Sequence, residues 1–80
     1  MTQRPIAQPL HRQLRDLIMA RIDSAEWPAG TYLPPETKLA EEYGVAVGTL
    51  RKALLDLANE GVVQRRQGKG TVVSSHDSDA

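Results

Sequence analysis

Cysteine is absent from this 80-residue sequence. Without it the chain can form neither a disulfide bond nor a thiolate metal site, which fits a reducing cytoplasm. The sequence also lacks an apolar run long enough to cross a membrane, and its first ten residues lack the apolar block of a secretory signal. We therefore expect a cytoplasmic protein that does not bind a membrane.

Aromatic residues are almost as scarce, with one tryptophan, two tyrosines and no phenylalanine. The core must therefore be built mainly from leucine and other aliphatic side chains. A chain of this length can bury only one small core, so we expect a single domain.

The sequence has no excess of charge of either sign, because ten basic residues balance ten acidic ones. Zero net charge is unusual for a strong, indiscriminate DNA binder. A local positive face could still form if the acidic residues lie elsewhere: Glu41, Glu42, Asp56, Glu60, Asp77 and Asp79. The cations of such a face would be Arg51, Lys52, Arg65, Arg66 and Lys69. The alternative is an ordinary solvated surface of mixed charge.

The sequence does contain a pattern for two short helices joined by a tight turn, within residues 36–53. Leu39, Ala40 and Tyr43 share one face of the first helix because residues three and four apart are helical neighbours. Gly44 can take the left-handed conformation that ends the helix, and Val45 follows as a buried turn residue. A second helix over residues 46–60 carries a buried apolar face: Leu50, Ala53, Leu54 and Leu57. Such a helix-turn-helix usually places its second helix in a DNA major groove.

A longer helix is predicted to begin near Pro9, since proline is tolerated in the first turn. Its apolar stripe repeats at helical spacing and consists of Leu10, Leu14, Leu17, Ile18 and Ile22, extended by Ala25. Arg15 falls on the solvent side, and Met19 lies off the stripe and should be partly exposed. His11 has no second ligand at metal spacing and is interpreted as a surface or boundary residue. We expect neither a metal nor a cofactor site.

Prolines and a glycine within residues 26–35 prevent this helix from continuing and force turns. Trp27 and Leu33 should close the core there, and Tyr32 with Leu33 could form a very short strand. Glu36 then opens the next helix, where a carboxylate complements the positive N-terminus.

The apolar period changes after Gly61. Residues 62–66 and 71–73 flank a glycine-containing loop at residues 67–70, which predicts a two-stranded hairpin. The expected fold is therefore mainly α with a small β-hairpin. In full, it is a winged helix-turn-helix of three helices plus a two-stranded wing.

Three regions follow from this pattern. Residues 9–73 form the winged helix-turn-helix domain. Residues 1–8 carry two prolines without apolar periodicity and are predicted to be a flexible arm. Residues 74–80 are polar, cannot bury a face and are predicted to be a disordered tail.

The stretch from Pro9 to Val73 resembles the N-terminal winged-helix domain of GntR-type bacterial transcription regulators. The resemblance is carried by P-L-H-R-Q-L at the first helix and P-A-G-T-Y-L-P before the second. It continues with K-L-A-E-E-Y-G-V and T-L-R-K-A-L-L-D-L across the helix-turn-helix, and G-V-V-Q-R-R-Q-G-K-G-T-V-V across the hairpin. Each motif alone is weak, but their order and spacing together are highly specific.

This resemblance implies a homodimer on a short palindromic operator in double-stranded DNA. The recognition helix, residues 46–60, would enter the major groove, and the wing loop, residues 67–70, would lie at the adjacent minor groove. By position in the family, Thr49 should contact phosphate and Arg51 a base edge or phosphate. The expected DNA-binding residues are Glu36, Thr37, Ala46, Val47, Gly48, Thr49, Arg51, Lys52, Gln67, Gly68 and Lys69.

The sequence departs from the family pattern at two positions where members carry DNA-contacting arginines. The usual L-P-S-E-R is here L-P-P-E-T, ending at Thr37, and G-V-S-R-x-T-V-R is here G-V-A-V-G-T-L-R, with Val47 in place of the arginine. Losing two cationic donors predicts weaker or differently selective binding. Val47 could instead meet a thymine methyl group, and Gly48 could let the backbone approach DNA closely.

Members of the family normally carry a large C-terminal domain that binds a small effector and dimerises. We expect no counterpart of that effector site within these 80 residues. The sequence fits either a fragment of a longer regulator or a short regulator.

Two other functions compete with DNA binding. A winged helix can serve as a protein-interaction module, which zero net charge, the lost arginines and an exposed Leu55 would favour. An enzyme is the weakest alternative. Residues 67–71 resemble a phosphate-binding loop, but Val63 stands where that motif requires glycine and Gly70 where it requires serine or threonine. No spacing pairs a nucleophile with a base.

Overall fold

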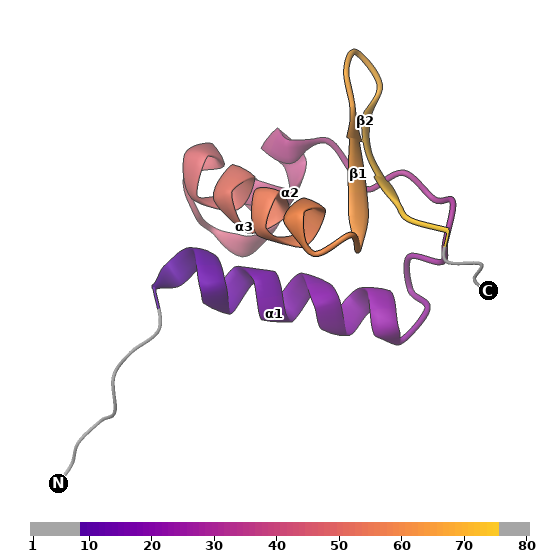
Figure 1. Ribbon diagram of the computed structural model, residues 1–80. Helices are drawn as coiled ribbons and strands as arrows, with labels where there is room; N and C mark the ends of the chain where they lie inside the picture. The colour runs from indigo at the N-terminus through magenta and orange to yellow at the C-terminus, as the bar shows by residue number, and fades with distance from the viewer. Residues whose placement is uncertain (1–8, 76–80) are drawn as a thin grey trace, which may run out of the picture.

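The computed structural model describes residues 9–75, which form three α-helices followed by a two-stranded antiparallel sheet. The elements are α1 (Leu10–Asp23), α2 (Glu36–Tyr43), α3 (Val47–Asn59), β1 (Val63–Arg66) and β2 (Gly70–Val73). In Figure 1, α1 lies beneath α2 and α3, and the hairpin rises beside α3. The predicted fold class, three helices plus a two-stranded wing, is confirmed. The arm predicted at residues 1–8 and most of the predicted tail, residues 76–80, lie outside the described residues.

Aliphatic side chains from all three helices and both strands form one core. The largest fully buried side chains are Ile18, Leu39, Leu50, Leu54, Leu57 and Val63. The predicted apolar faces of α2 and α3 are confirmed, and Trp27 and Leu33 are buried against this core as expected. None of the three helices in this part of the chain combines the length and apolar character that a membrane crossing requires.

The buried face of α1 differs from the predicted stripe. Leu14 and Ile18 are buried, but Leu10 and Leu17 are 49% and 51% exposed. The predicted extension of the stripe is also wrong, because Ala25 is exposed in the turn after the helix, with a φ of 67°.

The physical reason lies in how α1 packs against α3. His11 and Arg15 lie on the α3 side of α1, where their stems are covered while their polar ends meet Asp56 and Glu60 of α3 and its C-cap. The buried face is thereby rotated away from Leu10 and Leu17. Apolar periodicity alone assigns Arg15 to the solvent side and cannot reveal this rotation.

Charged side chains join α1 to its neighbours. The Arg21 guanidinium stacks on the Trp27 ring at 4.0 Å and donates hydrogen bonds to Glu26, Glu42 and the Tyr43 hydroxyl. The hydrogen bond from Arg21 holds the pKa of Glu26 below its ordinary value, and the hydrogen bonds from Arg15 do the same to the pKa of Glu60.

The turn between α2 and α3 is closed by Gly44, which has a φ of 68°. The Val45 amide donates to the Ala40 carbonyl at 2.9 Å and the Gly44 amide to the Glu41 carbonyl at 3.1 Å. This is the Schellman arrangement that ends a helix at a left-handed glycine. Val45, predicted to be buried, is partly buried and packs against the core.

Two glycine substitutions separate the effect of the left-handed backbone at Gly44 from the effect of side-chain packing. Gly44→Ala is expected to lower the free energy of unfolding by about 1–2 kcal/mol, because a Cβ disfavours the left-handed conformation. The control is Gly48→Ala within α3, which is expected to raise the free energy of unfolding by about 0.5–1 kcal/mol. An added Cβ meets nothing within 4 Å at either site. Urea unfolding followed by circular dichroism measures both, and shifts of the same sign would refute the argument.

The wing is anchored to the body along β2. Its register pairs Val63 with Val73 and Arg66 with Gly70, so the turn itself comprises residues 67–69. On its other side β2 meets the loop before α2, through a bridge between Tyr32 and Val72 and a 2.8 Å hydrogen bond from the Leu33 amide to the Thr71 carbonyl. The short strand expected at residues 32–33 is thus a single bridge. These bonds fix the wing relative to α2.

Candidate nucleic-acid interface

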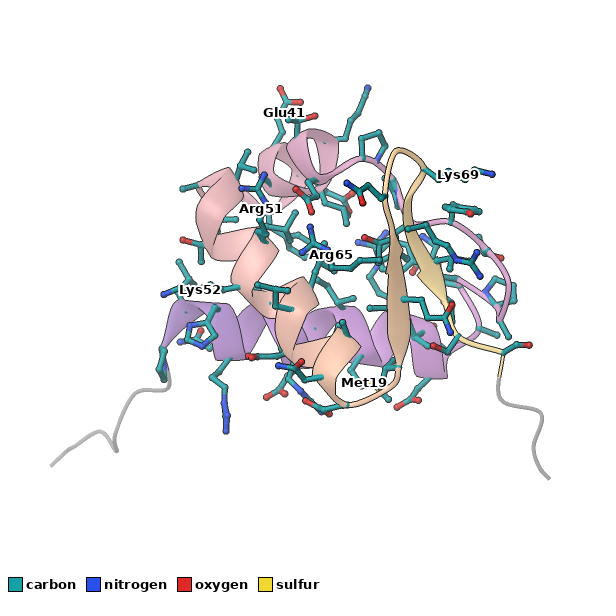
Figure 2. The ribbon with its side chains drawn as sticks, turned by 45° about the horizontal axis from the view of Figure 1, so that its top comes forward. Met19, Glu41, Arg51, Lys52, Arg65 and Lys69 are labelled. Carbon is teal, nitrogen blue, oxygen red and sulfur yellow. The ribbon has the colours of Figure 1, made fainter. Side chains whose placement is uncertain are left out.

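The predicted contact residues come from three places: the start of α2, the exposed side of α3 and the wing. Those that are exposed are Thr37, Ala46, Gly48, Arg51, Lys52, Gln67, Gly68 and Lys69. Those that are partly exposed are Glu36, Val47 and Thr49. Figure 2 shows Lys52 and Lys69 on opposite sides of the view, with Arg51 and Arg65 between them. All eleven positions are therefore accessible to some degree, although Lys52 lies at the margin.

The first turn of α3 presents a positive helix end. Ala46 is its N-cap, no side chain caps it, and the turn contains no acidic residue. The Val47 and Gly48 amides of this turn donate no backbone hydrogen bond among residues 9–75, and such amides carry partial positive charge. Thr49 and Arg51 extend from this end, so it offers donors suited to an anion such as a phosphate.

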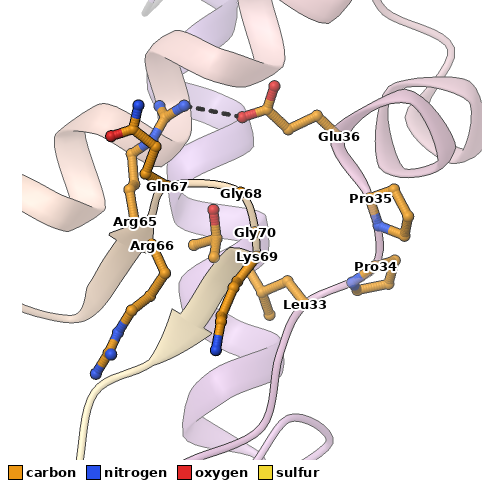
Figure 3. Close-up of a pocket in the computed structure, with 11 residues that line it drawn as sticks. Leu33, Pro34, Pro35, Glu36, Arg65, Arg66, Gln67, Gly68, Lys69 and Gly70 are labelled. Atoms are coloured by element: carbon orange, nitrogen blue, oxygen red, sulfur yellow. Dashed lines mark hydrogen bonds and ion pairs between the residues drawn. The ribbon is translucent and has the colours of Figure 1, made fainter.

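A carboxylate lies in the middle of this face. Arg51 donates two hydrogen bonds to Glu36 Oε1, from Nε at 3.1 Å and from Nη2 at 3.0 Å. Arg65 Nη2 donates to the other oxygen, Glu36 Oε2, at 3.2 Å, as the dashed line in Figure 3 marks. We call these three residues the Glu36 cluster. It links the start of α2, α3 and β1 through side chains.

Sequence reasoning missed the Glu36 cluster. The sequence predicts that Glu36 complements a helix end and lies among the DNA-binding residues, and that Arg65 belongs to a local positive face. The partners are 15 and 29 positions away from Glu36, beyond any local spacing rule. Only the hairpin and the turn at Gly44 bring them together.

An open groove of about 620 Å³ lies between the outer part of the wing and residues 33–36. Leu33, Pro34, Pro35 and Glu36 form one wall and residues 65–71 the other. In Figure 3, Arg65 points toward Glu36, whereas Arg66 and Lys69 point away from it. The cluster closes one end of the groove and leaves the outer cations of the wing free of it.

The predicted separation of charge is partly correct. Glu42 and Glu60 pair with Arg21 and Arg15, and Asp56 lies 3.7 Å from His11 Nε2, so these acids are held by α1. Within residues 9–75, Lys52, Arg66 and Lys69 form no ion pair. Arg51 and Arg65 of the predicted positive face are paired, because they share Glu36, an acid that the prediction did not count. Asp77 and Asp79 lie outside the described residues.

The two positions without the family arginines differ in environment. Thr37 is exposed, whereas Val47 is partly buried and packs against the core. Only part of Val47 is therefore free to meet a base. Leu55 is 44% exposed, as expected. Across residues 9–75, no group of three or more potential metal-ligating side chains comes together.

Comparison with known proteins places this arrangement among bacterial regulators. The profile of a family described as "Bacterial regulatory proteins, gntR family" matches residues 10–73. An HTH-type transcriptional regulator of Rhizobium meliloti (strain 1021), RB1450, is 40% identical over 77 residues, which cover 96% of this chain and 32% of the relative. The HTH-type transcriptional repressor NagR of Bacillus subtilis (strain 168) is 38% identical over 72 residues, which cover 90% of this chain and 29% of NagR. The chain thus spans about a third of the length of these relatives.

A solved structure is also similar to this chain. The DNA-binding domain of AraR in complex with operator ORR3 is similar with a TM-score of 0.80 and 30% sequence identity. The match covers 91% of this chain and 93% of that domain. In that structure the similar fold is bound to an operator.

Proposed function

The chain belongs to the gntR family of bacterial regulatory proteins, and we propose that it is a sequence-specific DNA-binding domain of a transcription regulator. The observation that carries this proposal is the face formed by α3 and the wing, on a fold similar to a domain solved with its operator. Its expected ligand is double-stranded DNA, so it would act in the cytoplasm. Its task would be binding and not catalysis, as the names of its relatives support.

Each element of the face has a role in this proposal. Helix α3 enters the major groove, which is wide enough to admit a helix, and Thr49 at its start donates to a phosphate. Arg51 has the length and planar fork to reach guanine O6 and N7 or phosphate oxygens. The wing tip lies at the minor groove, where Gly68 permits close approach and Lys69 contributes affinity more than sequence choice.

Two copies of the domain would bind together. A single α3 can read only a short half-site, and helix-turn-helix proteins read two such sites one DNA turn apart by pairing around a two-fold axis. We therefore propose a homodimer on a palindromic operator. A small effector, if one regulates the protein, would bind outside the 80 residues of this chain.

Selection of binding sites from random duplex DNA tests the function. We expect enrichment of a two-fold symmetric sequence. Affinity for it should fall with salt at a logarithmic slope of about −0.9 per phosphate contacted, so even two contacts weaken binding about tenfold between 50 and 200 mM salt. No enriched sequence together with salt-independent binding would refute the proposal and favour the protein-interaction alternative.

A further inference from the structure

Glu36 is the only carboxylate among the described residues that accepts hydrogen bonds from both α3 and the wing. The side chain of Glu36 is 22% exposed, whereas the side chain of Arg51 is 51% exposed. The carboxylate is therefore the more buried member of the pair, and the arginine retains a free outer edge.

The geometry of the cluster orients Arg51 without removing it from solvent. Both of its hydrogen bonds, from Nε and Nη2, end on one oxygen of Glu36, which fixes the plane of the guanidinium group. Among residues 9–75, Nη1 of Arg51 forms no hydrogen bond, so it stays available to a ligand. A side chain that is already held loses less conformational entropy on binding.

The cluster also weakens the attraction of this face for phosphate. Non-specific affinity for DNA comes almost entirely from cations that neutralise phosphates and release counterions. Arg51 and Arg65 share one negative charge, so they attract a randomly placed phosphate less than free arginines would. Only DNA that offers an acceptor to the held Arg51 gains the full contact.

We propose that Glu36 is a specificity-determining residue: it holds Arg51 in position for a matched acceptor and, by sharing its charge with Arg51 and Arg65, suppresses binding to unmatched DNA. This inference rests on the proposed function. It assigns Glu36 a role through two arginines. Glu36 would raise the ratio of operator affinity to non-specific affinity. In this way charge would select against the wrong DNA partners.

A pair of charge-matched variants tests the proposal. Glu36→Gln and Glu41→Gln each remove one negative charge from α2, and Glu41 is exposed without an ion pair among residues 9–75. Dissociation constants are measured for the selected operator and for a scrambled duplex of equal length, at several salt concentrations. Thermal unfolding by circular dichroism verifies that both variants are folded.

Glu36→Gln is expected to bind the scrambled duplex at least about threefold more tightly, with a salt slope steeper by about 0.9–1.8, as one or two released cations require. The ratio of operator to scrambled affinity should fall by a similar factor. Glu41→Gln should change either affinity by less than about twofold. Adding Arg65→Gln to Glu36→Gln should remove much of the gain, because that cation is then absent.

The outcomes separate the two proposals. If the wild-type protein binds operator but Glu36→Gln behaves like Glu41→Gln, Glu36 contributes only net charge and this inference is wrong. If Glu36→Gln loses operator affinity while binding to the scrambled duplex is unchanged, Glu36 acts by direct contact with DNA and this inference is also wrong. If the wild-type protein binds neither duplex, the proposed function fails and the inference falls with it.

Discussion

Arg51→Ala is expected to weaken operator binding by about fivefold to 150-fold. Arg51 supplies the long donor that reaches from α3 toward a base edge or phosphate, and loss of such a contact costs about 1–3 kcal/mol, where 1.4 kcal/mol is a factor of ten. The substitution also leaves Glu36 without one of its partners in the middle of the interface. Glu36 would then share its charge with Arg65 alone, so this part of the face would attract the DNA less. Fluorescence anisotropy with labelled operator measures the change.

Lys38→Ala is the matched control, because it removes one positive charge from an exposed position on α2. Lys38 has no ion pair within residues 9–75, and it is not among the predicted contact residues. Its loss should weaken binding by less than about threefold, as expected of a charge that acts only at a distance. Equal losses in the two variants would show that Arg51 has no special contact.

Ile18→Ala is expected to lower the free energy of unfolding by about 2–5 kcal/mol, because it opens a cavity in a core that has few side chains to refill it. Ile18 has no exposed surface and belongs to the hydrophobic core. In a domain of this size the loss should lower the melting temperature by more than about 10 °C. Urea unfolding and thermal unfolding both measure it.

The neighbouring Leu17→Ala provides the contrast. Leu17 is half exposed, so its truncation should change the free energy of unfolding by no more than about 0.5 kcal/mol. The apolar stripe predicted from the sequence places both residues in the core and would make both substitutions costly. A loss of several kcal/mol in Leu17→Ala would mean that the face of α1 is as the periodicity predicts and not as the structure shows.

Periodicity predicted the helices well wherever apolar residues alone decide which face is buried. The face of α3 formed by Leu50, Ala53, Leu54 and Leu57 is such a case, and Gly44 marked the turn because few other residues take its conformation. Helix α1 was harder. Its boundary with α3 is made partly by His11 and Arg15, whose stems pack while their polar ends form ion pairs. A hydrophobicity scale counts Arg15 as polar. It therefore predicts a buried face of α1 that is rotated away from the one in the structure.

The sequence predicted which residues lie at the interface. It did not predict which of their side chains pair with one another. The order of motifs located the start of α2, α3 and the wing, and the structure leaves the predicted residues of all three accessible. The pairing of Glu36 with Arg51 and Arg65 depends on the docking of β2 against the loop before α2, which is a long-range property. Local sequence patterns carry no signal for it.

This cluster also changes the meaning of the two missing arginines. With Thr37 and Val47 in their places, the face has fewer cations than the family pattern provides, and two of those that remain share one carboxylate. Among residues 9–75, the cations of this face that form no ion pair are at its margins, at Lys52 and in the wing. We therefore expect an interface of modest non-specific affinity in which the held Arg51 carries much of the sequence choice.

Mapping of backbone amide chemical shifts during titration with the selected operator, at low salt, tests whether α3 and the wing bind DNA. We expect large perturbations at Thr49, Arg51 and Lys69, and unchanged shifts at the exposed Leu17 of α1. Saturable perturbation of α3 and the wing together would place the DNA on this face. A folded protein whose shifts at Thr49, Arg51 and Lys69 do not move would show that this face does not bind DNA.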